Sequence, residues 1–284
     1  MPPQRTWLIT GVSSGFGRAL AEAALERGDN VAGTLRRPDQ LEPFNALQPD
    51  RALALLADVT DTPAVFRAVD ATIAAFGRVD VLVNNAGYGL QGAIEELDDA
   101  ASRAQFDVNV FGALEVTRAV LPHMRRQRSG HIVQVSSMAG VVGRAGLGLY
   151  AASKHALEGL SQSLAAETAP FGIRVTVVEP GAFRTEWAGR SMVHAEAIAD
   201  YDETVRPTRD RLARLNGKQA GDPARAAAAI MTAVDADDPP FRLPLGGDAV
   251  DMIRAALDRQ RAEIDAWEDV SRDVEFHDAE DTQR

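Results

Sequence analysis

The sequence predicts a doubly wound α/β fold, a single domain in which helices cover both faces of a parallel sheet of about seven strands. Short apolar runs alternate with longer amphipathic segments along the whole chain, which is typical of successive β-α units. Right-handed crossovers between such units build one parallel sheet. A glycine-rich turn at residues 10–17, between the first strand and the first helix, agrees with this arrangement.

Each expected strand is a short run dominated by apolar residues, the pattern of a strand that is buried on both faces. The run Trp7-Leu8-Ile9-Thr10 is the first of them. The expected strands lie, in order, at residues 7–10, 30–35, 52–56, 79–83, 132–135, 173–178 and 241–245.

Each expected helix is a longer segment with an apolar period near 3.6 residues. The expected helices lie, in order, at residues 15–27, 62–76, about 100–127, 149–169, 223–236 and from 248 onward. The stretch from 185 to about 216 is less regular and is rich in charged residues and in Met, Trp and Tyr. We expect this stretch to be a substrate lid or an insertion.

The length and composition favour one folded domain followed by an acidic tail. The chain has 284 residues, 45% of them hydrophobic, which is enough apolar material for one sizeable core. We place this domain at residues 1–261. Residues 263–281 include nine carboxylates and a single arginine. The tail at 262–284 is therefore expected to be a solvated helix end and a frayed terminus.

Charge and cysteine content exclude several classes of protein. The net charge of −11 argues against nucleic acid and anionic membranes as partners, because phosphates need clustered Lys and Arg. There is no cysteine, hence no disulfide and no thiolate zinc site, and the five histidines show no metal-ligand spacing. No secretory signal or membrane-spanning stretch is evident, so the expected location is cytoplasmic.

The glycine-rich turn is suited to a dinucleotide. Gly11 permits the sharp turn, Gly15 permits close approach of a pyrophosphate, and Gly17 permits tight packing of the helix on the strand. The N-terminus of the helix offers free N–H groups to phosphate. The hydroxyls of Ser13 and Ser14 add possible donors, and Phe16 lies within the same turn. An unliganded strand–helix turn is the alternative, and the surrounding β-α-β pattern favours the dinucleotide.

The end of the second strand indicates which dinucleotide is bound. A carboxylate about 20 residues beyond the glycines is typical of NAD, but this chain has Thr34-Leu35-Arg36-Arg37 there. A guanidinium matches the geometry of a phosphate. We therefore expect NADP(H) rather than NAD(H), with Arg36 as the main partner of the 2′-phosphate; solvated surface arginines are the alternative.

A tyrosine and a lysine are spaced for acid–base chemistry. Tyr150 and Lys154 are four residues apart in an expected helix, so they share one face. A nearby ammonium favours the phenolate and is expected to lower the Tyr150 pKa, and such a tyrosine can exchange a proton with a carbonyl oxygen. The chain has only three tyrosines and two lysines, which makes a chance match less probable than the motif alone suggests.

These motifs, taken in order, resemble the short-chain dehydrogenase/reductase superfamily in its single-domain branch, which has a Rossmann-type sheet. The resemblance covers about residues 6–185. The matching segments are Thr10 to Gly17, Asp58-Val59, Asn84-Asn85-Ala86-Gly87, Asn109, Ser136-Ser137, Tyr150 to Lys154 and Pro180-Gly181.

The resemblance implies a role for each matching residue. Tyr150 would be the general acid/base, Lys154 would lower its pKa and hold the nicotinamide ribose, Ser137 would bond the substrate oxygen, and Asn109 would hold a water for proton relay. The other residues that the resemblance assigns to the cofactor are Asp58 and Val59 at the adenine, Asn85, Ala86 and Gly87 at the ribose, and Pro180, Gly181, Phe183 and Thr185 at the nicotinamide.

The expected function is therefore NADP(H)-dependent hydride transfer between the nicotinamide and a carbonyl or secondary alcohol. Arg36 and the segment Arg242 to Gly246 resemble hydroxysteroid-dehydrogenase-like members. The family resemblance also implies a homodimer or homotetramer. A non-catalytic NADP(H) sensor is one alternative, which the retained Ser, Tyr, Lys and Asn disfavour. A dehydratase or epimerase is another, which the single-domain length and the Ser–Tyr–Lys order disfavour. The substrate stays open, because a fold supports many substrates. Tyr88, Trp187, Met192 and Tyr201 are candidates for the pocket wall or for ordinary packing.

Overall fold

A computed structural model describes residues 4–274 of the chain. Its centre is a seven-stranded sheet in the order β3-β2-β1-β4-β6-β7-β9, with every neighbouring pair parallel. The strands are β1 (Thr6–Ile9), β2 (Asn30–Leu35), β3 (Ala52–Leu56), β4 (Val81–Asn84), β6 (Gly130–Val135), β7 (Ile173–Pro180) and β9 (Arg242–Leu245). The predicted doubly wound parallel sheet is confirmed, and each expected strand is present with its ends within two residues.

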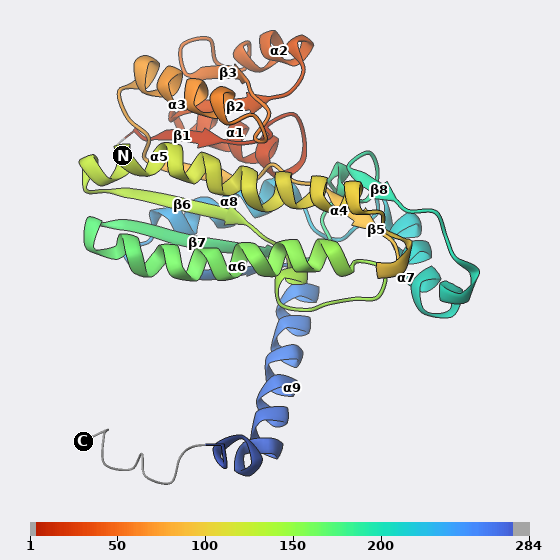
Figure 1. The fold of residues 1–284 in the computed structure, drawn as a ribbon. Coiled ribbons are helices and arrows are strands. Elements are labelled where there is room, and N and C mark those ends of the chain that lie inside the picture. Colours follow the sequence, from red (N-terminus) through yellow and green to blue (C-terminus); the bar gives the residue numbers. More distant parts are fainter. Residues whose placement is uncertain (1–3, 275–284) are drawn as a thin grey trace, which may run out of the picture.

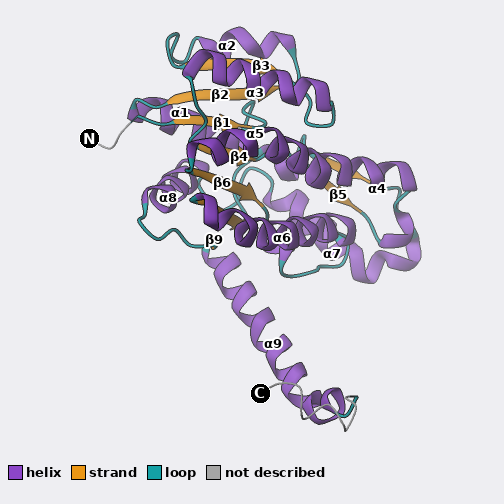
Figure 2. Cartoon of the chain, turned by 60° about the vertical axis from the view of Figure 1, so that its left-hand side comes forward, coloured by secondary structure: helices purple, strands orange, loops and turns teal. Residues whose placement is uncertain are grey.

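Helices cover both faces of this sheet (Figures 1 and 2). The longer helices are α1 (Gly15–Arg27), α3 (Thr62–Phe76), α4 (Asp99–Phe106), α5 (Ala113–Gln127), α6 (Gly148–Thr168), α7 (Asp202–Leu215), α8 (Pro223–Asp235) and α9 (Gly247–Arg272). One apolar cluster joins α1 and α8 to one face of the sheet, and a second joins α3, α5 and α6 to the other.

The strands divide their side chains between these two clusters. In β1, Trp7 and Ile9 belong to the α1/α8 cluster, whereas Leu8 belongs to the α3/α5 cluster, because successive side chains of a strand point to opposite faces. All three are at most 1% exposed. Burial on both faces explains why the strands are continuous apolar runs in the sequence.

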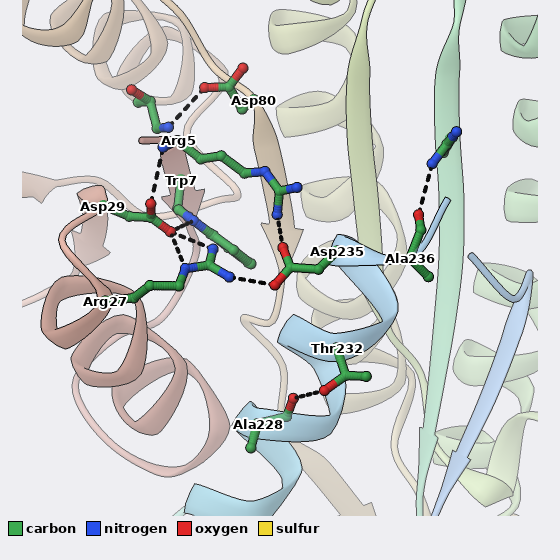
Figure 3. Close-up of polar contacts among 11 residues, drawn as sticks. Arg5, Trp7, Arg27, Asp29, Asp80, Ala228, Thr232, Asp235 and Ala236 are labelled. Atoms are coloured by element: carbon green, nitrogen blue, oxygen red, sulfur yellow. Dashed lines mark hydrogen bonds and ion pairs between the residues drawn. The ribbon is translucent and has the colours of Figure 1, made fainter. Parts of the chain in front are cut away.

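The amino ends of the strands are closed by a polar cluster (Figure 3). Asp29 accepts hydrogen bonds from the main-chain N–H of Arg5 at 3.0 Å and from the indole N–H of Trp7 at 2.8 Å. Arg27 of α1 donates both to Asp29 and to Asp235 at the end of α8. These contacts fasten two helices to the first strand and leave the opposite, carboxyl edge of the sheet for a ligand.

The helix expected at about 100–127 is interrupted. It divides into α4, a π-helical turn at Asp107–Gly112 and α5. The wider turn directs the Asn109 side chain inward, where it is 1% exposed and bonds the main chain of Tyr88. A side-chain hydrogen bond to a distant loop is not visible in helical periodicity, so the sequence could not place this break.

The less regular stretch at 185–216 contains two regular elements that the sequence reading did not assign. Strand β8 (Met192–His194) pairs with β5 (Gly89–Gln91) in a small second sheet, and α7 follows it. Glu96, whose side chain is fully buried, accepts from the main-chain N–H of Ile198 at 2.8 Å and forms an ion pair with Arg209 of α7. The stretch is thus attached to the body of the molecule by specific polar contacts.

Helix α9 leaves the body and projects outward (Figure 1). It is continuous through residue 261, so the boundary expected there lies inside a helix. Residues 262–272 are its exposed end, and the part of the expected acidic tail at 275–284 lies outside the described residues. Within residues 4–274, no helix combines the length and apolarity needed to cross a membrane.

Candidate active site

One large cavity of about 1080 Å³ opens at the carboxyl ends of the central strands. Ligands of open parallel sheets bind at this edge, where neighbouring crossovers run to opposite faces. Of the residues that the sequence assigns to the site, eighteen line the cavity. They are Gly11, Ser13, Ser14, Gly15, Phe16, Arg36, Asp58, Val59, Asn85, Ala86, Gly87, Ser137, Tyr150, Lys154, Pro180, Gly181, Phe183 and Thr185. Gly17 and Asn109 lie behind the wall.

The glycine-rich turn has the geometry of a phosphate cradle. Gly11 and Gly15 have φ values of +72° and +60°, which glycine adopts without steric cost. A Cβ at Gly17 would stand 2.5 Å from the main-chain oxygen of Gly11, so this glycine is required for packing. No side chain caps α1, so its first N–H groups remain available to an anion.

Asn85 holds two loops of this edge together. Its side-chain nitrogen donates to the main-chain oxygens of Thr10 at 2.8 Å and Gly11 at 3.0 Å. In return, the Thr10 hydroxyl accepts from the main-chain N–H groups of Asn85 and Ala86. The Asn85 side chain therefore fixes the glycine turn after β1 against the loop after β4.

The two arginines after β2 differ in their partners. Arg37 forms an ion pair with Asp39, at 2.5 Å. Arg36 is exposed at the cavity rim and has no ion-pair partner among the described residues. Since a guanidinium that is already paired binds a phosphate less readily, the geometry favours Arg36 over Arg37 as the anion-binding residue of this rim.

Tyr150 and Lys154 lie one turn apart on α6 and face the cavity. They are 6% and 5% exposed, and the Lys154 Nζ lies 5.8 Å from the Tyr150 ring centroid. Lys154 donates to the main-chain oxygen of Val135 at 2.8 Å. The i, i+4 spacing thus places both groups on one face, as expected, and β6 anchors the ammonium.

Burial sets the protonation of both groups. It raises the pKa of Tyr150 to about 12, against a smaller opposing effect of the hydrogen bond with Ser137. Burial also lowers the pKa of Lys154 to about 8, although the carboxylate of Glu158 opposes this. The expected lowering of the Tyr150 pKa is therefore wrong for the structure described here, because desolvation of the phenolate outweighs the effects that lower the pKa. Tyr150 is protonated near neutral pH.

Ser137 and Asn109 support this pair from two sides. Ser137 follows β6, accepts from the main-chain N–H of Ala139 at 3.1 Å, lines the cavity with Tyr150 and partly offsets the rise in the Tyr150 pKa that burial causes. Asn109 donates to the Ser153 hydroxyl at 3.1 Å, next to Lys154 on α6, and exchanges two hydrogen bonds with the Tyr88 main chain. Every polar atom of the Asn109 side chain thus has a protein partner.

The loop after β7 forms the opposite wall. Phe183 packs edge-on against Phe16 of the glycine turn, with ring centroids 5.0 Å apart. Asp248, near the start of α9, accepts from the main-chain N–H of Ala182 at 2.9 Å and lies so close to Gly181 that a Cβ there would clash. This packing explains the small residue at Gly181 and positions Phe183 and Thr185 at the cavity.

Behind Lys154 lies a buried group of charges that the sequence reading missed. Glu158, four residues after Lys154, and Glu179 of β7 are 6% and 0% exposed. Both lie near Arg242, whose Nε is 3.5 and 3.4 Å from their respective carboxylates. Burial, together with the nearby Glu158, raises the pKa of Glu179 to about 7, although Arg242 opposes this. The i, i+4 relation of Glu158 to Lys154 was the available sequence signal.

The remaining part of the cavity wall is largely apolar. Trp187 packs against Tyr150 with ring centroids 5.0 Å apart, and its buried indole N–H has no hydrogen-bond partner among residues 4–274. Tyr88 also lines the cavity, whereas Met192 packs beneath Gly89 and Tyr201 bonds Glu95 outside it. The sequence reading missed Arg144, Arg211 and Met252, which complete this wall, because they come from three separate segments.

Comparison with known proteins places the chain in a family. Residues 5–194 match the short chain dehydrogenase family, and the chain belongs to it. It is 41% identical to Oxidoreductase BOA17 of Botryotinia fuckeliana over 94% of this chain and 98% of that protein. It is 37% identical to 3-ketodihydrosphingosine reductase of Bacteroides thetaiotaomicron over 84% and 87%, respectively. The protein is therefore an oxidoreductase of the short-chain dehydrogenase/reductase family.

Solved structures agree with the fold. A short-chain dehydrogenase from Streptomyces avermitilis has a TM-score of 0.90 and 49% identity, over 96% of this chain and all of that one. A relative from Burkholderia phymatum in complex with NAD has a TM-score of 0.78 and 25% identity, over 88% and 92%. ElxO with NADP bound has a TM-score of 0.72 and 26% identity, over 88% and 100%. Structural relatives thus bind both nicotinamide dinucleotides.

Proposed function

We propose that this protein is an NADPH-dependent reductase that converts a ketone or aldehyde into an alcohol, with Tyr150 as the proton donor. The observation that carries the proposal is the position of Tyr150. It is protonated, lies beside Ser137 and Lys154, and faces a large cavity whose other end carries a phosphate cradle. A protonated tyrosine suits the reductive direction, in which a carbonyl oxygen must receive a proton.

The residues of the cavity fit a nicotinamide dinucleotide. Gly15 and Gly87 leave room where a Cβ would stand 3.4 Å from Thr185 and 3.1 Å from the Asn109 Oδ1, respectively, and the uncapped start of α1 offers N–H groups to the diphosphate. Asp58, Val59 and Ala86 would hold the adenosine, and Pro180, Phe183 and Thr185 would border the nicotinamide. The bound cofactor would supply the hydride.

The side chains of the protein have distinct parts in the reaction. The Ser137 hydroxyl donates to the substrate oxygen and orients it toward the Tyr150 hydroxyl. Tyr150 transfers its proton to that oxygen as negative charge develops there. The Lys154 ammonium, anchored by Val135, stabilises the phenolate that remains. Asn109 keeps α6 and the Tyr88 loop in register, so that this arrangement persists.

Arg36 is the basis for NADP(H) over NAD(H). It is exposed at the rim and has no carboxylate partner within residues 4–274. It occupies the position after β2 where NAD-binding sites use an acidic residue. A 2′-phosphate there would complete a charge-assisted hydrogen bond. An acidic residue at this position would repel the phosphate instead.

The segment at 185–216 is proposed to be the substrate lid. One face of α7 contributes Thr208, Arg211, Leu212 and Leu215 to the cavity wall, and these positions recur at helical spacing. The relative that is named a 3-ketodihydrosphingosine reductase supports a ketone as the reacting group. It also supports a cavity with room for an apolar chain.

The first experiment is a titration of the purified protein with NADPH and with NADH, followed by a panel of ketones. We expect tighter binding of NADPH and loss of nicotinamide absorbance with at least one ketone. NADPH binding without turnover on ketones, aldehydes and the corresponding alcohols would reject the reductase proposal. It would favour the non-catalytic NADP(H) sensor.

A further inference from the structure

We propose that Arg144 and Arg211 bind an anionic oxygen group, such as a carboxylate or sulfate, on an otherwise apolar substrate. This inference rests on the proposed function, because it assigns the substrate to the same cavity. Both arginines line the cavity wall. Neither belongs to the residues that the sequence or the family assigns to the cofactor.

Arg144 lacks a good acceptor. It lies in the loop between β6 and α6 and is partly buried. Among residues 4–274, its only side-chain hydrogen bond runs from Nη2 to the thioether sulfur of Met252, at 3.0 Å. A thioether is a weak acceptor for a guanidinium. A partly buried charge without a strong partner is unfavourable, and such local violations are characteristic of binding sites.

A second guanidinium lines the same cavity. Arg211 lies on the cavity-facing side of α7, one turn beyond Thr208. The loop of Arg144 packs against this helix, because a Cβ at Gly146 would stand 3.0 Å from Val205 and 3.7 Å from Thr208. Burial lowers the pKa of Arg144, and the charge of Arg211 lowers it in the same direction. Two neighbouring cations repel each other unless an anion lies between them. Among the residues that the structure describes, no carboxylate forms an ion pair with either arginine.

The nearby carboxylates are held by other groups. Asp248 is close enough to raise the pKa of Arg144, but its Oδ2 accepts the main-chain N–H of Ala182. Glu186 faces Arg190 at 3.7 Å. Asp248 therefore offsets part of the charge of Arg144 without an ion pair, and Arg211 keeps an exposed guanidinium.

The surroundings of the two arginines describe the rest of the ligand. Met252 contacts Arg144, and the apolar side chains that line the same cavity include Val142, Leu147, Trp187, Leu212 and Leu215. An apolar body would cover these side chains and exclude water from the guanidiniums, which strengthens a charge-assisted contact. The site thus fits an amphipathic anion better than a neutral ketone or a cation.

The affinity of small probe molecules tests whether the cavity prefers an anion, and the measurement does not require enzymatic turnover. We would measure, by titration calorimetry with excess NADP present, the affinity of octanoate, octyl sulfate, octanamide and octylammonium. We expect the better of the two anions to bind at least about 10-fold more tightly than octanamide, the lower range for hydrogen bonds to charged groups. Octylammonium should bind most weakly. The relative affinity of octanoate and octyl sulfate identifies the preferred anion.

Variants test whether Arg144 and Arg211 cause the preference for anionic probes. Arg144→Gln and Arg211→Gln should each bring the better anion to within about 3-fold of octanamide, by removal of a charged donor. Arg214→Gln, on the same helix but outside the cavity wall, should leave the preference unchanged. If Arg144→Gln fails to fold, Arg211→Gln decides, because this exposed residue tolerates replacement.

Two results would overturn the inference. One is equal binding of the anions and octanamide to the unmodified protein. The other is loss of NADPH affinity in Arg144→Gln or Arg211→Gln, which would assign the arginines to the cofactor phosphates. Failure of the proposed function looks different, because ketones would then go unreduced whereas the anion preference would persist.

Discussion

The Lys154 ammonium donates a hydrogen bond to the main-chain oxygen of Val135, at 2.8 Å. Val135 is the last residue of β6, directly before Ser136 and Ser137, so one contact links α6 to the strand end that carries Ser137. It holds the ammonium 5.8 Å from the Tyr150 ring. The geometry of the reacting groups is therefore set by the packing of α6 on the sheet.

Replacement of Tyr150 tests its role as proton donor. Tyr150→Phe removes the hydroxyl and keeps the ring that packs on Trp187. We expect reduction of any accepted ketone to fall by at least about 100-fold, the lower scale of general acid catalysis, while NADPH affinity changes less than about 3-fold. Stopped-flow absorbance and a binding titration measure the two quantities.

Tyr88→Phe, another tyrosine of the cavity wall, is the matched control and should retain most of the activity. Equal loss in the two variants would mean that the aromatic hydroxyls act on pocket structure rather than on proton transfer.

The charge of Lys154 predicts a pH dependence. Burial lowers its pKa to about 8 and raises that of Tyr150 to about 12, so Lys154 loses its charge first as the pH rises. The reduction rate should be level below pH 8 and fall above it, since the neutral amine no longer stabilises the developing phenolate. A kcat/KM profile from about pH 6 to 10 measures this. A level profile across that whole range would contradict the role given to Lys154.

The cofactor preference depends on Arg36. Arg36→Ala should weaken NADPH binding by about 1.5–3 kcal/mol, the scale of a hydrogen bond to a charged group, with little effect on NADH. Fluorescence titration with both cofactors gives the comparison.

Arg37→Ala is the control for this site, because Arg37 is paired with Asp39. It should weaken NADPH by less than Arg36→Ala does. A similar loss of NADH and NADPH affinity in Arg36→Ala would show that Arg36 does not bind the 2′-phosphate.

The raised pKa of Glu179 predicts that the free energy of unfolding of the protein decreases as the pH rises. Its pKa is raised to about 7 by burial and by Glu158. The folded protein thus keeps a proton that the unfolded chain releases near its ordinary value of 4.5. The resulting stabilisation is complete below pH 4.5 and is lost as the pH rises through 7. Glu179→Gln should therefore be more stable than the unmodified protein at pH 8, by about 1–3 kcal/mol.

Urea unfolding followed by circular dichroism at pH 5 and pH 8 measures this difference, which should be small at pH 5. Glu167→Gln removes an exposed carboxylate of the same helix as Glu158 and should show no comparable pH dependence. Lower stability of Glu179→Gln at both pH values would mean that the Arg242 contact outweighs the cost of burying the charge.

Local patterns in the sequence were sufficient to predict most of the fold. Continuous apolar runs located all seven strands of the main sheet, and the glycine spacing located the turn at 10–17. The short strands β5 and β8 were not predicted, because three residues with a mixed pattern carry no periodic signal. The interruption of the helix at Asn109 was not predicted either, because its cause is a contact with the distant Tyr88 loop.

By itself, the sequence determined the parallel sheet, the glycine-rich turn at residues 10–17 and the placement of Tyr150 and Lys154 on one helix face, because each depends on spacing along the chain. Only the tertiary structure decided the protonation of these groups, the burial of Glu158 and Glu179 beside Arg242, and the placement of Arg144 and Arg211 in one cavity wall. The physical reason is that desolvation and the approach of charges from separate segments depend on how the helices pack on the sheet. The Tyr150 pKa illustrates this, since spacing predicted a lowered value and burial raised it to about 12.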